Sequence, residues 1–257
     1  MQKPQNIKGM RDHLPQAMRL RQHILDTLTS IFAQYGFEPL STPVLEYAET
    51  LEGKLGDEEK LIYRFEDHGG RKLALRYDQT VPLARVVAQY ANEITLPWRR
   101  YAIGASYRGE RPARGRYREF WQADIDIVGS ASPLADAEIV AILTDSLHAL
   151  GFPSFKTLIN HRQILGGIAR FSGLDEAASA EVYRAIDKLD KIGADGVQEE
   201  LERSGVQPAQ AKRILAMVMT EGSSEDMLRE LETHLREDTQ AMAALENMRA
   251  ILTALSD

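Results

Sequence analysis

Arginine dominates a short segment near the middle of this 257-residue chain. Between Trp98 and Arg118 lie seven arginines and one acid, Glu110, so the local excess is seven minus one, or +6, in a protein of net charge −7. No lysine occurs there, and arginine is the side chain suited to fixed, bidentate contact with phosphate or carboxylate. The segment therefore predicts an anion-binding site. The seven are Arg99, Arg100, Arg108, Arg111, Arg114, Arg116 and Arg118.

Two strand-like runs flank this segment, and alternate side chains of a strand share a face. Arg108 and Glu110 then lie on one face, where the guanidinium can hold a phosphate while the carboxylate accepts from an amine. The returning strand carries on one face an aromatic ring, an amide and two carboxylates: Phe120, Gln122, Asp124 and Asp126. An exposed hairpin with charges paired across its strands, at about 0.3 kcal/mol a pair, explains the same pattern. The residues alone leave both interpretations open.

Residues 107–122, YRGERPARGRYREFWQ, resemble motif 2 of class II aminoacyl-tRNA synthetases, in the version of the histidyl-tRNA synthetase family. Three further parts of the chain resemble that family in the same order and spacing. Residues 7–15 (IKGMRDHLP) resemble its N-terminal signature, and residues 75–80 (LRYDQT) resemble its R-x-[DE]-x-T segment. Residues 160–162 and 189–193 resemble parts of its helical insertion domain.

The resemblance implies a histidine–tRNA ligase, which uses ATP and Mg²⁺ to form histidyl-adenylate and transfers histidine to tRNA(His). Arg108 would be the catalytic residue and would bind the α-phosphate of ATP and the histidine carboxylate region. Three residues would hold the remainder of ATP, with the ring stacked on adenine: Glu110, Arg116 and Phe120. Four would surround the amino group and imidazole of histidine: Asp78, Thr80, Gln122 and Asp126.

Hydrophobic spacing predicts the elements that position these groups. Helices are expected at 15–35, 80–90 and 134–150, and an extended segment or edge strand at 37–45. Antiparallel hairpins are expected from 62–65 with 72–76 and from 99–107 with 120–128, followed by a short strand at 155–160. Residues 161–257 show helical spacing. We predict an α+β fold: a class II synthetase-like antiparallel sheet flanked by helices over residues 1–160, then a small all-helical domain over 161–257.

Composition excludes several classes of protein. The chain has no cysteine, which excludes disulfides, zinc–thiolate sites and a cysteine nucleophile. The six histidines lack the spacing of metal ligands, so no protein-bound metal is predicted. The N-terminus lacks a signal peptide, and no stretch approaches the ~18 apolar residues that span a bilayer. We therefore expect a cytoplasmic protein that binds no membrane.

The family's later histidine-specific R-G-L-D-Y-Y segment and its motif 3 have no counterpart in this chain. We therefore expect an N-terminal fragment that also lacks the anticodon-binding domain and has weak aminoacylation activity or none. The helix at 15–35 and the segment after it resemble motif 1, which implies a homodimer. Two other functions stay open: a non-catalytic, histidine-sensing regulatory subunit of ATP phosphoribosyltransferase, and an RNA- or partner-binding module built from the helical tail.

Overall fold

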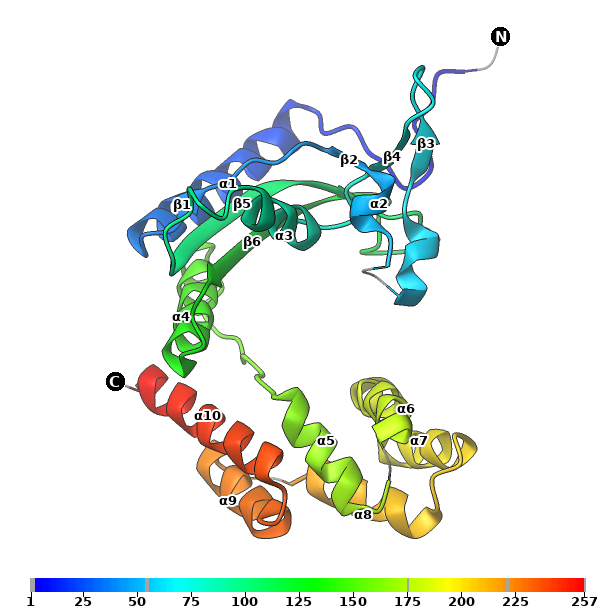
Figure 1. The fold of residues 1–257 in the computed structure, drawn as a ribbon, viewed down its shortest axis with the longest axis vertical. Helices are drawn as coiled ribbons and strands as arrows, with labels where there is room; N and C mark the ends of the chain where they lie inside the picture. The colour runs from blue at the N-terminus through cyan, green and yellow to red at the C-terminus, as the bar shows by residue number, and fades with distance from the viewer. Residues whose placement is uncertain (1–2, 54–55, 175, 221, 257) are drawn as a thin grey trace. The chain divides into compact units, whose positions relative to one another are not determined.

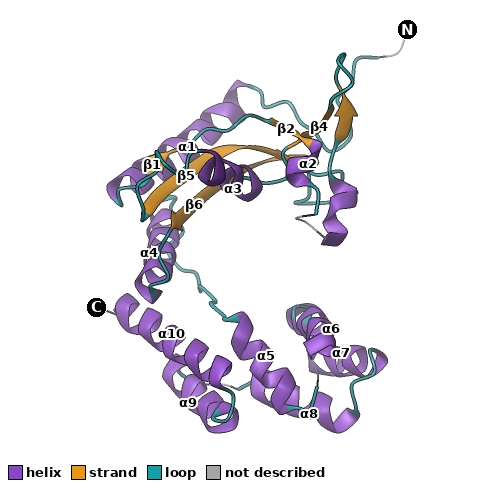
Figure 2. Cartoon of the chain, viewed as in Figure 1, coloured by secondary structure: helices purple, strands orange, loops and turns teal. Residues whose placement is uncertain are grey.

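A computed structural model of the chain describes residues 3–53, 56–174, 176–220 and 222–256. The chain divides into two compact units (Figure 1). The first comprises the residues up to Ala131 together with Glu138–Phe155, and the second comprises Ser132–Ala137 and the residues from Lys156 onward. The first unit contains both helices and strands, whereas the second contains helices and no strand among its described residues (Figure 2).

The first unit contains two small sheets. Their strands are β1 (Glu38–Pro39), β2 (Leu45–Tyr47), β3 (Arg64–Glu66), β4 (Lys72–Leu75), β5 (Trp98–Tyr107) and β6 (Glu119–Val128). One sheet has the order β1-β5-β6, with β1 parallel to β5, and the other has the order β2-β4-β3. Strands β5 and β6 form the long antiparallel hairpin that the sequence predicts, from the Trp98–Val128 pair to the Tyr107–Glu119 pair. The predicted hairpin of β3 and β4 is also confirmed.

Alternation of side chains gives the β5–β6 hairpin one apolar face. Tyr101 and Ile103 of β5 and Ile125 and Ile127 of β6 pack against a buried cluster. The cluster comes from helix α1 (Pro15–Gln34), the residue Phe37 and helix α4 (Pro133–Ala149), and consists of Ile31, Phe32, Phe37 and Ile142. Burying these side chains removes apolar surface from water and holds both helices on this face. The opposite face of the hairpin carries the polar residues.

Helix α3 (Thr80–Gln89) follows β4, and helix α2 (Ala48–Leu51) follows β2. A 3₁₀ helix, η1 (Gly56–Leu61), precedes β3. A small cluster of Leu51, Ile62, Ala74 and Tyr77 buries the contact between these short elements. The helices expected at 15–35, 80–90 and 134–150 are therefore present as α1, α3 and α4.

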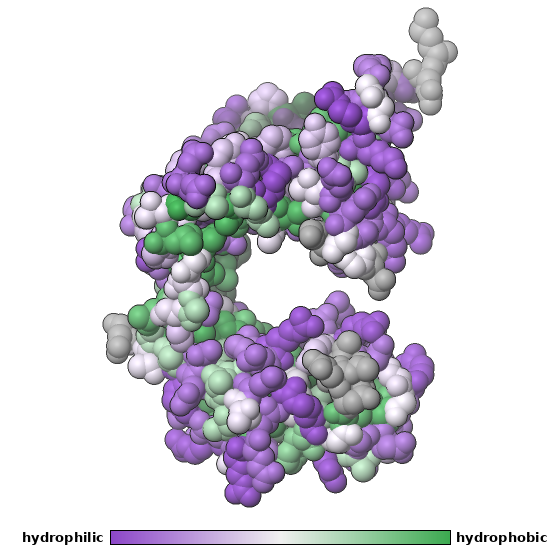
Figure 3. All heavy atoms as spheres, viewed as in Figure 1, coloured by the Kyte–Doolittle hydropathy of each residue, from purple (hydrophilic) through white to green (hydrophobic). Residues whose placement is uncertain are grey.

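The second unit is a bundle of six helices among the described residues. They are α5 (Arg162–Phe171), α6 (Glu176–Ile186), α7 (Leu189–Arg203), α8 (Pro208–Val218), α9 (Ser224–Leu235) and α10 (Thr239–Ser256). One continuous apolar core joins them, with Val182, Val197, Leu201, Ile214 and Leu245 among its most buried side chains. Polar residues cover most of the surface of this unit on the face drawn in Figure 3.

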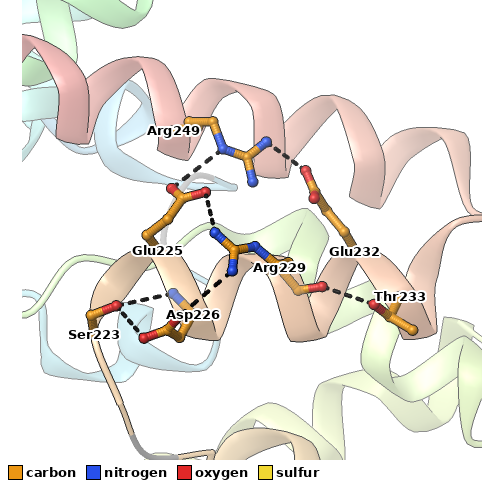
Figure 4. A network of polar contacts seen from close by, with 7 residues as sticks. All are labelled: Ser223, Glu225, Asp226, Arg229, Glu232, Thr233 and Arg249. Carbon is orange, nitrogen blue, oxygen red and sulfur yellow. Dashed lines mark hydrogen bonds and ion pairs between the residues drawn. The ribbon is translucent and has the colours of Figure 1, made fainter.

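A network of charged side chains joins α9 to α10 (Figure 4). Arg249 of α10 donates to Glu232 of α9 at 2.5 Å, and its Nε lies 3.5 Å from a carboxylate oxygen of Glu225. At the start of α9, Ser223 accepts from the backbone N–H of Asp226 at 3.2 Å, which satisfies one of the free donors of the first turn. The contacts of Arg249 join α9 to α10, whereas the Ser223 contact caps the start of α9.

The predicted strand at 155–160 is wrong. Residues 155–160 form an irregular segment that joins no sheet. The ring of Phe155 packs on His148 of α4, with 4.9 Å between ring centroids. A short apolar run becomes a strand only where a neighbouring strand can accept its backbone hydrogen bonds.

Candidate active site

Arg108 lies directly after β5 and is held between two aromatic rings. Its guanidinium carbon is 4.3 Å from the ring centre of Tyr77 and 4.9 Å from that of Phe120. Its Nε donates to the backbone carbonyl of Tyr77 at 3.3 Å. Within the described part of the chain, neither Nη group of Arg108 has a hydrogen-bond partner. Stacking on both sides fixes the plane of the guanidinium and leaves its two terminal nitrogens for an anion.

The loop between β5 and β6 is closed by pairs of its own residues. Arg116 Nη1 lies 3.0 Å from Glu110 Oε2, and the Arg118 Nε donates to the Glu110 carbonyl at 3.0 Å. The N-terminal segment lies against this loop, because the Arg118 N–H donates to the Gly9 carbonyl at 2.8 Å. A Cβ on Gly9 would lie 2.8 Å from the ring of Pro112, so the close approach requires glycine there.

Arg76 braces the segment that contains Tyr77 and Asp78. Its buried guanidinium donates to the carbonyls of Ala105 at 2.7 Å and Thr42 at 2.9 Å. A Cβ on Gly104 of β5 would lie 2.4 Å from an Arg76 nitrogen, so glycine makes room for the guanidinium. Burial lowers the pKa of Arg76. Arg76 thus joins the two small sheets, two residues before the predicted site residue Asp78.

Asp78 lies one residue before Gln79, the N-cap of α3, and its carboxylate reaches the first turn of that helix. Its Oδ1 accepts from the backbone N–H groups of Thr80 at 3.1 Å and Val81 at 3.0 Å. These two bonds satisfy free donors of the first turn and fix the orientation of the carboxylate. Thr80 is exposed in that turn.

The polar face of the hairpin carries a row of functional groups from β6. The register places Gln122 opposite Gly104, Asp124 opposite Ala102 and Asp126 opposite Arg100. Arg100 is 0% exposed and forms an ion pair with Asp126. Four buried side-chain atoms on this face lack a hydrogen bond within the described chain, namely Arg100 Nε, Arg100 Nη1, Ser106 Oγ and Gln122 Oε1. Native interiors rarely leave such groups unsatisfied, so they are available to a polar ligand.

The electrostatics of this face centre on Asp124. Burial raises the pKa of the Asp124 carboxyl, and the negative charges of Asp126 and Asp78 raise it further. The positive charges of Arg100 and Arg108 act in the opposite direction and lower it. Residues from the end of β5, from β6 and from the start of α3 therefore lie within electrostatic range of one carboxylate.

The predicted site residues thus fall into groups in the first unit. Arg108 contacts Phe120, and Glu110 contacts Arg116. Asp78 and Asp126 both act on Asp124, which lies two residues from Gln122 along the same face of β6. The alternation of β6 also placed Asp124 on this face, although the residue was not assigned a role. Sequence reasoning assigned no role to Tyr77 and counted Arg100 only among the arginines of the predicted anion site. Their positions follow from the chain turn before α3 and from the hairpin register.

The features that follow are separate from the charged groups of the β5–β6 hairpin. A cavity of about 790 Å³ lies in the second unit beside Arg170 and Asp238, which pair with each other at 2.7 Å. No group of three or more acidic or histidine side chains that could hold a metal ion occurs among the described residues. None of the helices, as far as the chain is described, has the length and apolar character needed to cross a membrane.

Comparison with known proteins identifies the family. The family model described as Histidyl-tRNA synthetase matches residues 9–257. A histidine–tRNA ligase of Aeropyrum pernix is 44% identical over 99% of this chain and 59% of its own length. One of Helicobacter hepaticus is 42% identical over 98% of this chain and 58% of its own length. The chain therefore spans less than two thirds of these relatives.

Solved structures give the same result. A crystal structure of a histidyl-tRNA synthetase from a Nostoc species superposes with a TM-score of 0.89 at 33% identity, and the match covers 100% of this chain and 58% of that one. A Bacillus halodurans protein, described as an ATP phosphoribosyltransferase regulatory subunit/histidyl-tRNA synthetase, superposes with a TM-score of 0.83 at 25% identity over 100% of this chain and 66% of that one. These comparisons also support the α+β fold class. The chain belongs to the histidyl-tRNA synthetase family.

Proposed function

We propose that the chain is the N-terminal part of a histidine–tRNA ligase, with the early catalytic domain over residues 1–160 and the helical insertion domain over 161–257. In the first step, a carboxylate oxygen of histidine attacks the α-phosphorus of ATP, and pyrophosphate leaves with the bonding electrons. In the second step, a terminal ribose hydroxyl of tRNA(His) attacks the carbonyl carbon of the adenylate and AMP leaves. The site must bring two anions together in the first step.

The fixed guanidinium of Arg108 is the observation that carries this proposal. Held between Tyr77 and Phe120, it presents its terminal nitrogens without having to be ordered when ATP binds. A preorganised positive charge at the α-phosphate reduces the repulsion between histidine and ATP and stabilises the charge that develops during transfer. Mg²⁺ would accompany the phosphates of ATP as part of the substrate and would neutralise part of their charge.

The other ATP contacts require one rearrangement. Glu110 and Arg116, assigned to opposite ends of ATP, pair with each other at 3.0 Å. The Arg116 side chain is 72% exposed, and an ion pair in that environment is worth at most about 1 kcal/mol. The pair can therefore separate when ATP arrives. Phe120, on the same face, supplies the ring for adenine.

Histidine would lie over the carboxylates of the hairpin. Asp78 and Asp126 supply acceptors for its amino group and imidazole, and Gln122 offers the unpartnered amide oxygen Oε1. Thr80, which is exposed in the first turn of α3, completes the set of residues proposed to surround histidine. Burying an ammonium group without such partners would cost several kcal/mol, so specificity for an amino acid depends on them.

The regulatory-subunit function is the second candidate. It is favoured by the structural likeness to the Bacillus halodurans protein, whose description joins both functions. A histidine sensor has no use for an α-phosphate clamp, so the held Arg108 favours the ligase. Binding of histidine without binding of ATP would reverse this preference.

The partners follow from the same proposal. We propose a cytoplasmic homodimer that binds tRNA(His), with α1 and the segment after it at the dimer interface. Helix α1 leaves Leu20 63% exposed beside a groove of about 380 Å³ that it forms with β6, where Trp121 is also exposed. Such apolar surface beside a groove is typical of a protein interface. Sedimentation of the chain, with Leu20→Asp as a disrupting variant, measures its oligomeric state.

Calorimetric titration tests the proposed function. The chain is titrated with ATP–Mg²⁺, with histidine, and with each in the presence of the other. The ligase proposal expects both to bind and each to strengthen the other. Binding of histidine alone would favour the regulatory subunit, and binding of neither would contradict both.

A further inference from the structure

The polar face of the β5–β6 hairpin contains a buried charge that the proposed reaction does not use. Arg100 is fully buried and opposes Asp126 directly in the hairpin register. Its Nη2 forms an ion pair with Oδ2 of Asp126, and its Nε and Nη1 have no hydrogen bond among the described residues. A buried guanidinium is costly unless its charge is compensated. Asp126 supplies that compensation and is in turn held in one orientation.

A second carboxylate lies beside this pair. Asp124 is two residues before Asp126 on β6, so both side chains lie on the same face. Opposite Asp124 stands Ala102, a buried side chain too small to fill the space or to donate a hydrogen bond. Asp124 is partly buried and has no hydrogen bond within the described chain, although Arg100 and Arg108 lie within electrostatic range.

The charges around Asp124 do not cancel. Asp78, Asp124 and Asp126 contribute −3, and Arg100 and Arg108 contribute +2, so the sum is −1. Arg108 is oriented by Tyr77 and Phe120 and is assigned to an anion. When an anion occupies Arg108, the remaining acidic charge requires a cation. A cluster with this balance is suited to a substrate that carries both a carboxylate and a protonated nitrogen.

We propose that Asp124 is a specificity-determining residue that accepts a hydrogen bond from a cationic nitrogen of the amino-acid substrate, with Arg100 as the positioning residue that holds Asp126 beside it. This inference rests on the proposed function, because it requires the site to bind an amino acid. The two carboxylates then have different roles. Asp126 is oriented by the buried Arg100, and Asp124 remains unpaired until the substrate binds. An ionised carboxylate at this partly buried position costs free energy, and a purely structural role would not require one there.

Calorimetric titration of the chain with histidine and with histidinol, which keeps the amine and the imidazole but lacks the carboxylate, tests Asp124. Asp124→Asn is nearly isosteric and removes only the charge. We expect the variant to lower the affinity for histidine and for histidinol at least about tenfold. The affinity for ATP–Mg²⁺ should be unchanged, which also shows that the fold is intact. Asp26→Asn, at an exposed position of α1, removes one charge of the same unit and should have no effect.

Two variants test the positioning role. Arg100→Lys keeps a charge that can pair with Asp126, whereas Arg100→Met removes it. We expect Arg100→Lys to retain most of the histidine affinity and Arg100→Met to lose it. A merely structural role would not produce this difference between two variants that both bind ATP normally. If Arg100→Met does not fold, Asp124→Asn decides the proposal.

The outcomes separate this inference from the proposed function. If the unaltered chain binds histidine and Asp124→Asn binds it equally well, the inference on Asp124 is wrong and the proposed function stands. Equal histidine affinity of both Arg100 variants and the unaltered chain would overturn the positioning role alone. Failure of the unaltered chain to bind histidine would overturn the proposed function and this inference together.

Discussion

Arg108 donates through Nε to the backbone carbonyl of Tyr77 at 3.3 Å, and its guanidinium carbon lies 4.3 Å from the centre of the Tyr77 ring. One residue therefore supplies both a hydrogen-bond acceptor and a stacking surface. Burial, together with a 2.5 Å hydrogen bond to Glu58, raises the pKa of Tyr77 to about 12. The segment before α3 and the hairpin β5–β6 thus meet at one arginine.

Asp124→Asn should make the protein more stable at pH 7. Burial and neighbouring acids raise the pKa of Asp124 in the folded state above the ordinary 3.8, so the ionised carboxylate opposes folding. Below pH 3.8 the group is protonated in both folded and unfolded states, and the cost disappears. It grows as the pH rises from 3.8 to the folded-state pKa and is constant above that.

Thermal unfolding of both forms over this pH range measures the effect. The variant should have the higher Tm at pH 7, and the difference should shrink as the pH falls toward 3.8. A lower Tm of the variant at pH 7 would mean that the carboxylate stabilises the fold, and an equal Tm would mean that it costs nothing. Either result contradicts a carboxylate that opposes folding.

Gly167→Ala should destabilise the helical unit. A Cβ at Gly167 of α5 would lie 2.6 Å from Cβ of Ala241 in α10, a distance at which the two helices must separate. Overpacking of this kind costs about 1–3 kcal/mol of unfolding free energy. Chemical denaturation followed by circular dichroism gives the value.

Gly166→Ala is the matched control on the same helix. A Cβ there would approach only the far ends of Arg170 and Tyr183, both at 3.1 Å, which can shift. Alanine is also favoured over glycine in a helix by about 1 kcal/mol, so this variant should be neutral or more stable. A loss equal to that of Gly167→Ala would show that the close contact with Ala241 is not the cause.

The α9–α10 network should contribute little at high salt and more at low salt. Arg249→Met removes the contacts to Glu225 and Glu232 (Figure 4) and should lower the unfolding free energy by less than about 1 kcal/mol, because partly exposed pairs are screened. The hydrogen bond from Arg249 also lowers the pKa of Glu232 below the ordinary 4.5.

The pH dependence of this contribution has a definite sign. A lowered carboxyl pKa stabilises the folded state above pH 4.5, and this stabilisation is lost as the pH falls through the folded-state value. The difference between Arg249→Met and the unaltered chain should therefore narrow in acid. Arg213→Met, at an exposed position of α8, serves as the control. A loss that does not depend on salt or pH would assign the effect of Arg249 to packing.

The sequence predicts the elements with strong periodicity well. Apolar spacing identifies α1 and α4, and alternation identifies both strands of the hairpin and the shared face of Phe120, Gln122, Asp124 and Asp126. The predicted strand at 155–160 fails because a strand depends on a partner that a single segment does not reveal.

Long-range pairs in the site could not be predicted from the sequence either. The ion pair of Arg100 with Asp126 depends on the hairpin register, and the contact of Gly9 with Arg118 joins segments far apart in the chain. The excess of arginine predicted one anion site, but the structure divides the arginines among different roles. Arg99 pairs with Glu138 at 3.0 Å, and Arg100 is buried. Both lie in β5, outside the loop that contains Arg116.

The affinity of the chain for ATP–Mg²⁺, measured by calorimetry with and without Arg108→Ala, tests the central claim most directly. Arg111→Ala, in the same loop and exposed, is the matched control for loss of one positive charge. We predict that Arg108→Ala weakens ATP binding by at least about 2 kcal/mol, or about thirtyfold, and that Arg111→Ala has little effect. Equal ATP affinity of the unaltered chain and Arg108→Ala would contradict the account.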